Sequence, residues 1–311
     1  MSKILLIETS TTLCSVALAD DGCADHARGS REAQSALSGE GCWQIVASRR
    51  SEEPRQHASL TAVFIDEVLR EAGLIGEGAG AGKPGNGPLA EEATVDLRGA
   101  GLAAVALSAG PGSYTGLRVG SSTAKGICFG AGVPLISVGT LDILAWQGLA
   151  AAGSSLASGQ AGAPALAAAE GLTILPMIDA RRSEVYTAQY RVENGVPVRK
   201  TEVAPVILEA GSFADLFAAG PVLVIGDGAA KFADLLGADA TREAADSGSN
   251  AATAPAAASK GNALFIQCCP EAEAMLQPAI KKFEAGEFEN IAYFEPFYLK
   301  DFVATVGKKL F

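Results

Sequence analysis

The feature that most constrains the fold is a unit that occurs twice: an apolar run that ends in an acid, a polar turn and a second apolar run. Residues 4–18 read ILLIETSTTLCSVAL, in which Glu8 ends the first run and hydroxyl side chains fill the turn. Residues 172–190 repeat this order, with Asp179 as the terminal acid. Short apolar runs bounded by polar turns predict strands. The repeat therefore predicts an internal duplication, with two α/β halves that each open with a strand–turn–strand unit.

Other apolar runs predict the remaining elements, which are strands over 43–48, 102–107, 133–138 and 221–225 and helices over 57–74, 139–151 and 263–283. This order, with an acid at the end of each opening strand, resembles ribonuclease-H-like domains. In active members of that architecture the acids hold a divalent metal ion, and the hydroxyls and amides of the turn contact phosphate. The alternative is that each acid is an ordinary solvated residue at a strand end.

The composition excludes several classes of function. The net charge of −11 disfavours direct wrapping of nucleic acid, because phosphate contacts need clustered Lys and Arg. The two histidines, His26 and His57, are too few for a histidine-rich metal site. Six cysteines without a CxxC pair indicate free thiols in a reducing compartment. With neither a signal peptide nor an apolar span of about 20 residues, we expect a cytoplasmic protein that does not enter a membrane.

Four segments predict loop insertions, because they are biased toward small or turn-forming residues and match nothing in the family discussed below. They are 27–42, 76–97, 150–170 and 238–260. We expect two subdomains, residues 1–138 and residues 139–294, with 295–311 completing the first of them. Long surface insertions add little to the entropy of loop closure and are compatible with this division.

Residues 105–130, VALSAGPGSYTGLRVGSSTAKGICFG, contain the strongest local motif. An apolar strand enters a Gly-Pro-Gly-Ser turn and continues as a helix, an arrangement whose backbone amides suit an anion. The spacing matches neither a P-loop nor a dinucleotide fingerprint, so a tight turn is the alternative, as it is for the Gly-Asp-Gly turn at 226–228. The residues predicted to face phosphate or nucleotide, as vestiges of a site, are Glu8, Thr9, Ser10, Gly112, Ser113, Asp179, Gly226 and Gly228.

Two helices are expected to meet a partner. In the helix after the Gly-Pro-Gly-Ser turn, small residues recur every four positions and form one ridge. In the helix over 57–74, the apolar stripe is wide enough to be buried on two sides. The residues predicted to bind the partner are His57, Leu60, Phe64, Val68, Gly116, Gly120 and Ala124. A bulky Gly120→Phe substitution is expected to weaken partner binding without unfolding the chain.

The sequence resembles the TsaB (YeaZ) family, the non-catalytic partner in bacterial tRNA threonylcarbamoyladenosine synthesis. The resemblance rests on ILLIETSTTLCSVAL, GPGSYTGLRVG, PLISVGTLDILA, MIDARRSEVYTAQY and EPFYLK, which occur in this order from end to end. It implies an α/β fold of the actin/sugar-kinase-like (ASKHA) class, with two ribonuclease-H-like halves and mixed sheets flanked by helices. It also implies a heterodimer with the catalytic paralogue TsaD through the two helices described above, and joint work with the ATPase TsaE.

The same resemblance implies a scaffold and activator in forming the N6-threonylcarbamoyl group on adenosine 37 of tRNAs that read codons beginning with A. The chain would reach tRNA only through the complex. No tightly bound cofactor and no metal are expected, and ATP or ADP at the partner interface is left open. Whether the free chain forms a homodimer is also left open.

The expectation of a non-catalytic chain rests on two positions. The paralogue carries an HxxxH metal motif after its own GPG turn, where this chain has Thr140 and Leu144. Leu cannot ligate a metal and Thr is a poor substitute for imidazole, so no catalytic residue is assigned. Two alternatives stay open. One is a small-molecule kinase or ATPase of the same fold, with a metal held by Glu8 and Asp179. The other is a peptidase acting on the paralogue, against which the lack of a complete nucleophile–base set argues.

Overall fold

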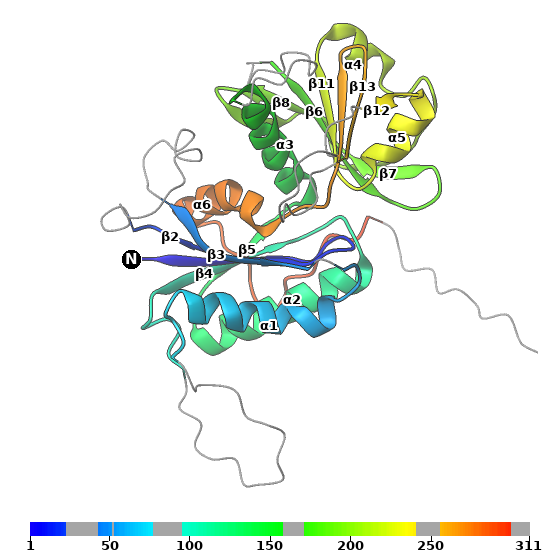
Figure 1. Ribbon diagram of the computed structural model, residues 1–311. Coiled ribbons are helices and arrows are strands. Elements are labelled where there is room, and N and C mark those ends of the chain that lie inside the picture. Colours follow the sequence, from blue (N-terminus) through cyan, green and yellow to red (C-terminus); the bar gives the residue numbers. More distant parts are fainter. Residues whose placement is uncertain (23–42, 52, 77–94, 158–170, 241–255, 300–311) are drawn as a thin grey trace, which may run out of the picture.

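The computed structural model describes residues 1–22, 43–51, 53–76, 95–157, 171–240 and 256–299, and it has two halves that each contain a sheet (Figure 1). The first sheet has the strand order β3-β2-β1-β4-β5. Its strands β1, β2 and β3 pair antiparallel, whereas β4 pairs in parallel with both β1 and β5. These strands are β1 (Lys3–Glu8), β2 (Ser15–Asp20), β3 (Gln44–Arg50), β4 (Leu102–Ser108) and β5 (Leu135–Val138).

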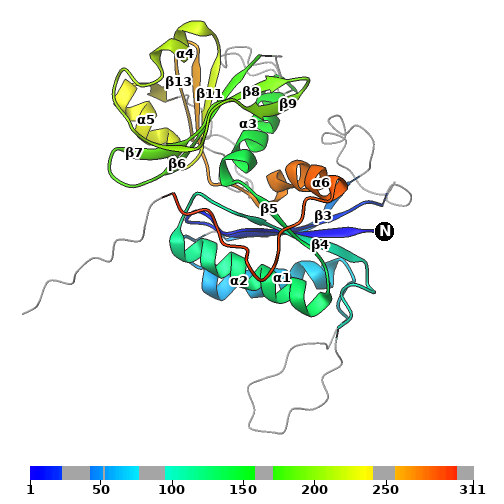
Figure 2. The same ribbon diagram turned by 180° about the vertical axis from the view of Figure 1, so that it is seen from behind.

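Helical segments cover both faces of the first sheet, and they are α1 (His57–Glu71), α2 (Tyr114–Ala131), the 3-10 segment η2 (Ala272–Met275) and α6 (Leu276–Ala285). Both views place α1 and α2 together on one face and α6 on the other (Figures 1 and 2). Leu5 and Ile7 of β1 belong to the core under α1 and α2, whereas Ile4 and Leu6 belong to the core under η2 and α6. Because successive strand residues point to opposite faces, the ILLI run supplies both cores.

The second sheet has the order β10-β7-β6-β11-β14-β13-β12, with β8 pairing with β6 and β9. Its strands are β6 (Thr173–Asp179), β7 (Glu184–Thr187), β8 (Tyr190–Glu193), β9 (Val196–Arg199), β10 (Ala204–Ile207), β11 (Val222–Ile225), β12 (Asp239–Ala240), β13 (Ala256–Lys260) and β14 (Ala263–Gln267). The accompanying helices are α3 (Thr140–Ala157), α4 (Ala214–Ala219) and α5 (Ala229–Leu236). Helix α3 lies on one face of this sheet and α5 on the other (Figure 1). Leu141 and Leu144 of α3 join the core on the first of these faces, and Phe232 of α5 joins the core on the second.

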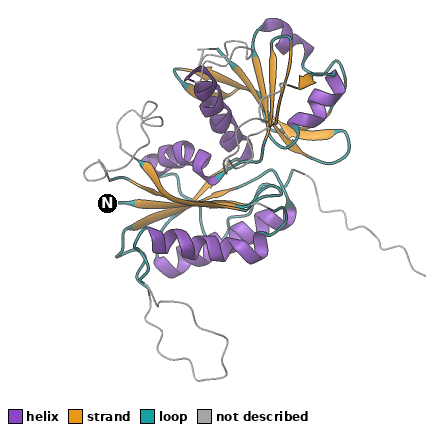
Figure 3. Ribbon diagram, viewed as in Figure 1, coloured by secondary structure: helices purple, strands orange, loops and turns teal. Residues whose placement is uncertain are grey.

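The predicted repeat is confirmed by the strand pairing. β1 forms an antiparallel hairpin with β2 and a parallel pair with β4, and β6 pairs in the same way with β7 and β11. Glu8 ends β1 and Asp179 ends β6. Both sheets contain parallel and antiparallel pairs and are flanked by helices, as the resemblance implied (Figure 3).

One predicted element is wrong in its first part. The helix expected over 263–283 begins only after a strand, β14, and the 3-10 segment η2. Residues 263–267 read ALFIQ and pair in parallel with β11. A short apolar run does not distinguish a buried strand from a buried helix, because neither shows an exposed polar face.

The subdomain boundaries stay a prediction, although the packing of the chain bears on them. The first sheet ends at Val138, and α3 joins the core of the second half. Helix α6, within the range predicted for the second subdomain, packs on the first sheet, where Phe283 meets Trp43 edge-to-face at 6.0 Å between ring centroids. After α6 the chain stays with the first half, because the Phe297 N–H donates to the Ala109 carbonyl over 2.7 Å.

The predicted insertions fall mostly outside the described residues. This holds for 27–42, for most of 76–97 and 150–170, and for the middle of 238–260. In the described parts, α3 continues to Ala157, and β12 and β13 occupy the two ends of 238–260. None of the helices in the described ranges combines the length and apolar character that a membrane span requires.

Candidate functional site at the two strand ends

Glu8, the last residue of β1, lies completely inside the protein. Its Oε1 atom accepts a hydrogen bond from the Ser10 N–H over 2.6 Å, whereas Oε2 has no hydrogen-bond partner among the described residues. Burial raises the pKa of the Glu8 carboxyl to about 7, against the lowering effect of hydrogen bonding by Ser10. The Glu8 carboxyl therefore changes its protonation state near neutral pH, whereas an exposed glutamate is already ionised there.

Three buried hydroxyls accompany this carboxyl. Ser10 Oγ, Thr11 Oγ1 and Thr140 Oγ1 have no hydrogen-bond partner in the described part of the chain. Thr140 comes from the start of α3, and its N–H donates to the Gly110 carbonyl over 2.9 Å, next to the Gly-Pro-Gly-Ser turn. Buried polar groups without partners are rare in proteins, and they call for a specific explanation. Ser10 and Thr11 follow Glu8 in the first hairpin, and all three hydroxyls lie inside the protein, where solvent does not reach them.

The Gly-Pro-Gly-Ser turn lies directly on the first hairpin. The Ser113 N–H donates to the Ser10 carbonyl over 2.5 Å, and the Ser113 Oγ caps α2 by accepting from the Gly116 N–H over 3.3 Å. A Cβ added to Gly112 would lie 2.1 Å from the same Ser10 carbonyl oxygen. Glycine is therefore needed at position 112 because the two backbone segments approach closely inside the protein. This contact supports the alternative interpretation of the motif, a tight turn.

The ridge of small residues on α2 also packs within the chain. A Cβ on Gly116 would lie 2.0 Å from the Thr9 carbonyl oxygen, and one on Gly120 would lie 2.2 Å from Thr9 Oγ1. Ala124 is fully buried in the same core. The direct partner contact predicted for Gly116, Gly120 and Ala124 is therefore revised, because Thr9 and the first core already cover them. Gly120→Phe is now expected to disturb folding.

The second strand end has a different environment. Asp179 is exposed, its Oδ1 accepts from the Lys231 Nζ over 2.5 Å, and its own N–H donates to Asp227 Oδ1 over 2.7 Å. Asp227 comes from the Gly-Asp-Gly turn after β11, and burial raises the pKa of its carboxyl to about 6. The charge of Asp227 also raises the pKa of Glu8, with a much smaller effect than burial.

The glycines of that turn also serve close packing. Gly226 has a φ of 129° and approaches the Met177 carbonyl oxygen, to which an added Cβ would come within 2.2 Å. A Cβ on Gly228 would meet the Val185 side chain at 2.9 Å. Sequence reasoning included these two glycines but missed Asp227 between them. The signal was present, since an acid in a turn directly after an apolar strand is the same pattern that selected Glu8 and Asp179.

On α1, the residues predicted to bind a partner divide by burial. Val68 is fully buried, and His57 is nearly so, with its Nε2 3.2 Å from the Leu13 carbonyl oxygen. Burial lowers the pKa of His57, which favours the neutral imidazole. Leu60 and Phe64 are half-buried. Val63 on α1 is instead 46% exposed, and sequence reasoning missed it because it lies outside the strict four-residue spacing.

Helix α2 carries a more exposed apolar side chain than α1. Phe129, near the end of α2, is 85% exposed, although the buried residues of this helix belong to the first core. Since α1 and α2 lie side by side on one face of the first sheet, their outward surfaces are adjacent (Figure 1). We call the outward surface of α1 and α2 the outer helical face; it carries Leu60, Val63 and Phe64 on α1 and Phe129 near the end of α2.

The two halves define a class of protein, the actin/sugar-kinase-like fold with two ribonuclease-H-like subdomains. The family described as "TsaD: tRNA N6-adenosine threonylcarbamoyltransferase" matches residues 88–308, so the chain belongs to that family. Within it, the chain is similar to proteins named TsaB and YeaZ, which confirms the resemblance seen in the sequence.

Two curated relatives and one solved structure document this similarity. The Escherichia coli "tRNA threonylcarbamoyladenosine biosynthesis protein TsaB" is 28% identical over 97% of this chain and 96% of its own length. The Bacillus subtilis protein of the same name is 32% identical over 32% of this chain and 36% of its own length. The structure of "YeaZ from Pseudomonas aeruginosa" matches with a TM-score of 0.59 and 22% identity, over 96% of this chain and all of that one, and supports the fold.

Proposed function

We propose that this chain is the non-catalytic subunit that supports TsaD, together with TsaE, in forming the N6-threonylcarbamoyl group on adenosine 37 of tRNA. Involvement in threonylcarbamoyladenosine biosynthesis is supported by the relatives named for that process, one of which matches along nearly its whole length. The finer assignment, to a scaffold and activator, is drawn from the chemistry of the site.

The non-catalytic role is inferred from the residues at positions 140 and 144, where the paralogue has the histidines of its metal motif. Leu144 is fully buried in the core of the second half, where it packs with Leu141 and Ile174. Thr140 is also fully buried, at the first turn of α3. An aliphatic core side chain cannot become a metal ligand without loss of that core packing. The position that the paralogue uses for chemistry is used here for stability.

We propose that the outer helical face binds TsaD. Its central side chains are apolar, and Phe129 and Val63 are exposed. Interaction surfaces are enriched in large exposed apolar side chains, and here such side chains occur on two neighbouring helices. The buried residues Val68, Gly116, Gly120 and Ala124 would support this face from beneath by holding α1 and α2 on the sheet.

We propose that this chain holds a nucleotide at the partner interface only weakly. The hydroxyls of Ser10 and Thr11 have no partner in the described part of the chain, but they are buried, so a phosphate group would reach them only if the hairpin opened. In addition, Glu8, Asp179 and Asp227 bring three carboxyl groups to the same region, and the ammonium of Lys231 is engaged by Asp179. The balance of charge disfavours tight binding of ATP or ADP by this chain alone.

The experiment combines complex formation and activity. The purified chain is mixed with TsaD, and size exclusion with light scattering reports the stoichiometry. Threonylcarbamoylation of tRNA is then assayed with TsaD and TsaE, with and without this chain. We expect a one-to-one complex, no modification by the chain alone and strong stimulation of TsaD.

The enzymatic alternative predicts a different pattern. ATP turnover by the isolated chain that is lost in Glu8→Gln would favour a kinase or ATPase of the same fold, because that reading assigns the metal to Glu8 and Asp179. Absence of a complex between folded partners, with nucleotide present, would contradict the scaffold role.

A further inference from the structure

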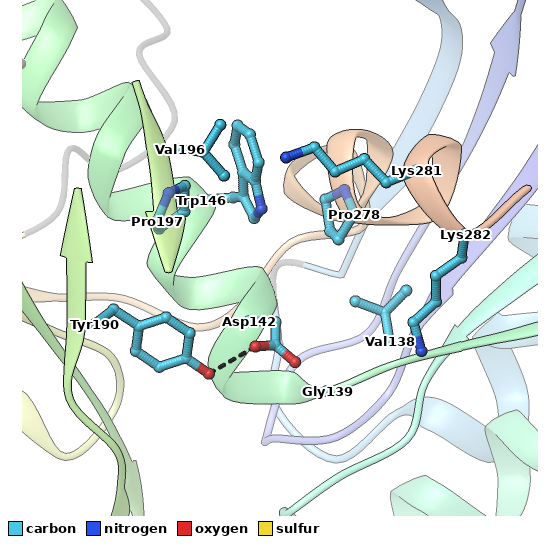
Figure 4. A pocket seen from close by; sticks show the side chains of 10 residues that line it. All are labelled: Val138, Gly139, Asp142, Trp146, Tyr190, Val196, Pro197, Pro278, Lys281 and Lys282. Carbon is cyan, nitrogen blue, oxygen red and sulfur yellow. Dashed lines mark hydrogen bonds between the residues drawn. The ribbon is translucent and has the colours of Figure 1, made fainter. Parts of the chain in front are cut away.

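A cavity of about 260 Å³ lies where the two halves meet, and none of its lining residues belongs to the strand-end site. One wall comes from α3, a second from the β8–β9 hairpin and a third from α6 (Figure 4). Helix α6 packs on the first sheet, and α3 packs on the second. A molecule in this cavity would therefore contact both halves.

The cavity contains one carboxylate whose position is well defined. The Tyr190 hydroxyl donates a hydrogen bond to Asp142 Oδ1 over 2.7 Å, and Tyr190 is 2% exposed (Figure 4). Burial and the adjacent carboxylate raise the pKa of the Tyr190 hydroxyl, so it remains a donor. Asp142 is thereby held as a hydrogen-bond acceptor at the start of α3.

Two lysines of α6 line the cavity, and their ammonium groups point in different directions (Figure 4). Lys282 Nζ donates to the Ser137 carbonyl over 2.8 Å and is therefore held against β5. Lys281 Nζ lies 4.9 Å from the ring centroid of Trp146 and forms no hydrogen bond or ion pair with any residue that the structure describes. Desolvation lowers the pKa of Lys281, as expected for an ammonium held against an apolar surface.

Most of the remaining lining is apolar. Val138, Pro197 and Pro278 complete the walls beside the Trp146 indole. Ligand sites in proteins combine such apolar walls with a few convergent polar groups. The Lys281 ammonium and the Asp142 carboxylate lie apart in the lining (Figure 4), so the part of the cavity beside Trp146 carries a positive charge, although the whole chain carries a net charge of −11. A positive charge in this position favours an anion.

We propose that this cavity is a binding site for a small organic monocarboxylate. The carboxylate would pair with the Lys281 ammonium, and the body of the ligand would contact Trp146 and the two prolines. The cavity volume suits a ligand with one ring. This inference does not depend on TsaD or on the strand-end site, so it can be tested on the isolated chain.

The test uses Trp146 as the reporter and benzoate as the probe. Trp43→Phe removes the other of the two tryptophans in the chain, so that fluorescence comes from the cavity alone. Titration with benzoate is expected to change this fluorescence saturably, in the millimolar range. Benzamide has a similar shape without the charge and is expected to bind about tenfold more weakly, since a charge-assisted hydrogen bond contributes on that scale.

Two variants in the Trp43→Phe background locate the effect. Lys281→Met keeps an apolar side chain and removes the charge, and it is expected to weaken benzoate binding about tenfold. Lys260→Met on β13, which does not line the cavity, should leave the affinity unchanged and serves as the matched control. Circular dichroism confirms that each variant is folded.

Three results would overturn the proposal. They are no saturable change with benzoate, equal affinity for benzoate and benzamide, and equal benzoate affinity in Lys281→Met and its parent. The comparison of benzoate with benzamide needs no substitution at Lys281, so it remains decisive even if that variant proves unstable.

Discussion

The two opening hairpins have the same topology and opposite environments. Glu8 ends β1 in full burial, with one carboxylate oxygen unpaired among the described residues, whereas Asp179 ends β6 at the surface and pairs with Lys231. The difference comes from what covers each strand end. The Gly-Pro-Gly-Ser turn and α2 cover the first hairpin, through contacts of Gly112 and Gly116 with Ser10 and Thr9. A duplicated fold can thus keep an acid at both strand ends while the chemistry of the two acids diverges.

The largest effect is expected from breaking the cover over the first hairpin. Gly116→Ala places a Cβ about 2.0 Å from a backbone carbonyl oxygen that cannot rotate away. We expect a loss of more than about 3 kcal/mol in the free energy of unfolding, measured by urea denaturation.

The matched control for this substitution lies on the same helix. Gly126→Ala meets no atom within 4 Å and should stabilise the chain by about 0.5–1 kcal/mol, because alanine has the higher helix propensity. Similar stability of the two variants would show that α2 does not press on Thr9 as described.

The next largest effect concerns how the free energy of unfolding depends on pH through the Glu8 carboxyl. The pKa of Glu8 is raised from 4.5 to about 7 in the folded chain, so the folded state holds this proton more tightly than the unfolded state. Glu8 therefore favours folding at pH values below 4.5, and this contribution is lost as the pH rises through about 7.

The measurement is the difference in unfolding free energy between the wild-type chain and Glu8→Gln, followed with pH. Over the window from 4.5 to about 7, we expect this difference to change by up to about 3 kcal/mol, at about 1.4 kcal/mol per pKa unit. The wild type should lose stability relative to the variant as the pH rises. A difference that stays flat across the window would contradict the burial of an unpaired carboxyl.

A smaller effect is expected at the outer helical face, which belongs to the first half alone. Val63→Glu places a charge on an exposed apolar position and should weaken association with TsaD about tenfold or more, measured by calorimetry. Ile207→Glu is the control, because Ile207 is 66% exposed on β10 of the second half. Equal losses in the two variants would point to nonspecific apolar contact and against this face.

The smallest effect is expected at the second hairpin. Lys231→Met removes the ion pair with Asp179, whose side chains are 28% and 41% exposed. Ion pairs this accessible to solvent contribute less than about 1 kcal/mol, so thermal unfolding should shift only slightly. Lys200→Met, which removes a comparable surface pair with Glu193, should behave in the same way. A large loss confined to Lys231→Met would mean that the second strand end is as tightly constrained as the first.

Much of the fold was predictable from apolar periodicity. The hairpin repeat, the strand before the Gly-Pro-Gly-Ser turn and the helix after it all follow from runs whose spacing differs between strand and helix. The run over 263–267 was misassigned because five apolar or neutral residues show neither period clearly, and only pairing with β11 makes them a strand.

The site was less predictable, because its properties depend on contacts distant in sequence. A four-residue spacing showed that Gly116, Gly120 and Ala124 share a face, but not that Thr9 covers it. The same limit applies to Glu8, whose burial depends on a turn about one hundred residues later in the chain. Asp227 follows the same sequence pattern as Glu8 and Asp179, but its burial and its hydrogen bond with the Asp179 N–H appear only when β6 and β11 pair.

The measurement that tests the central claim most directly is tRNA threonylcarbamoylation by TsaD and TsaE in the presence of the Glu8→Gln chain. If the first strand end serves packing and not chemistry, the variant should form the complex and support activity within a few-fold of the wild type. Loss of activity to background in a complex that still forms would contradict the non-catalytic role and assign the chemistry to Glu8.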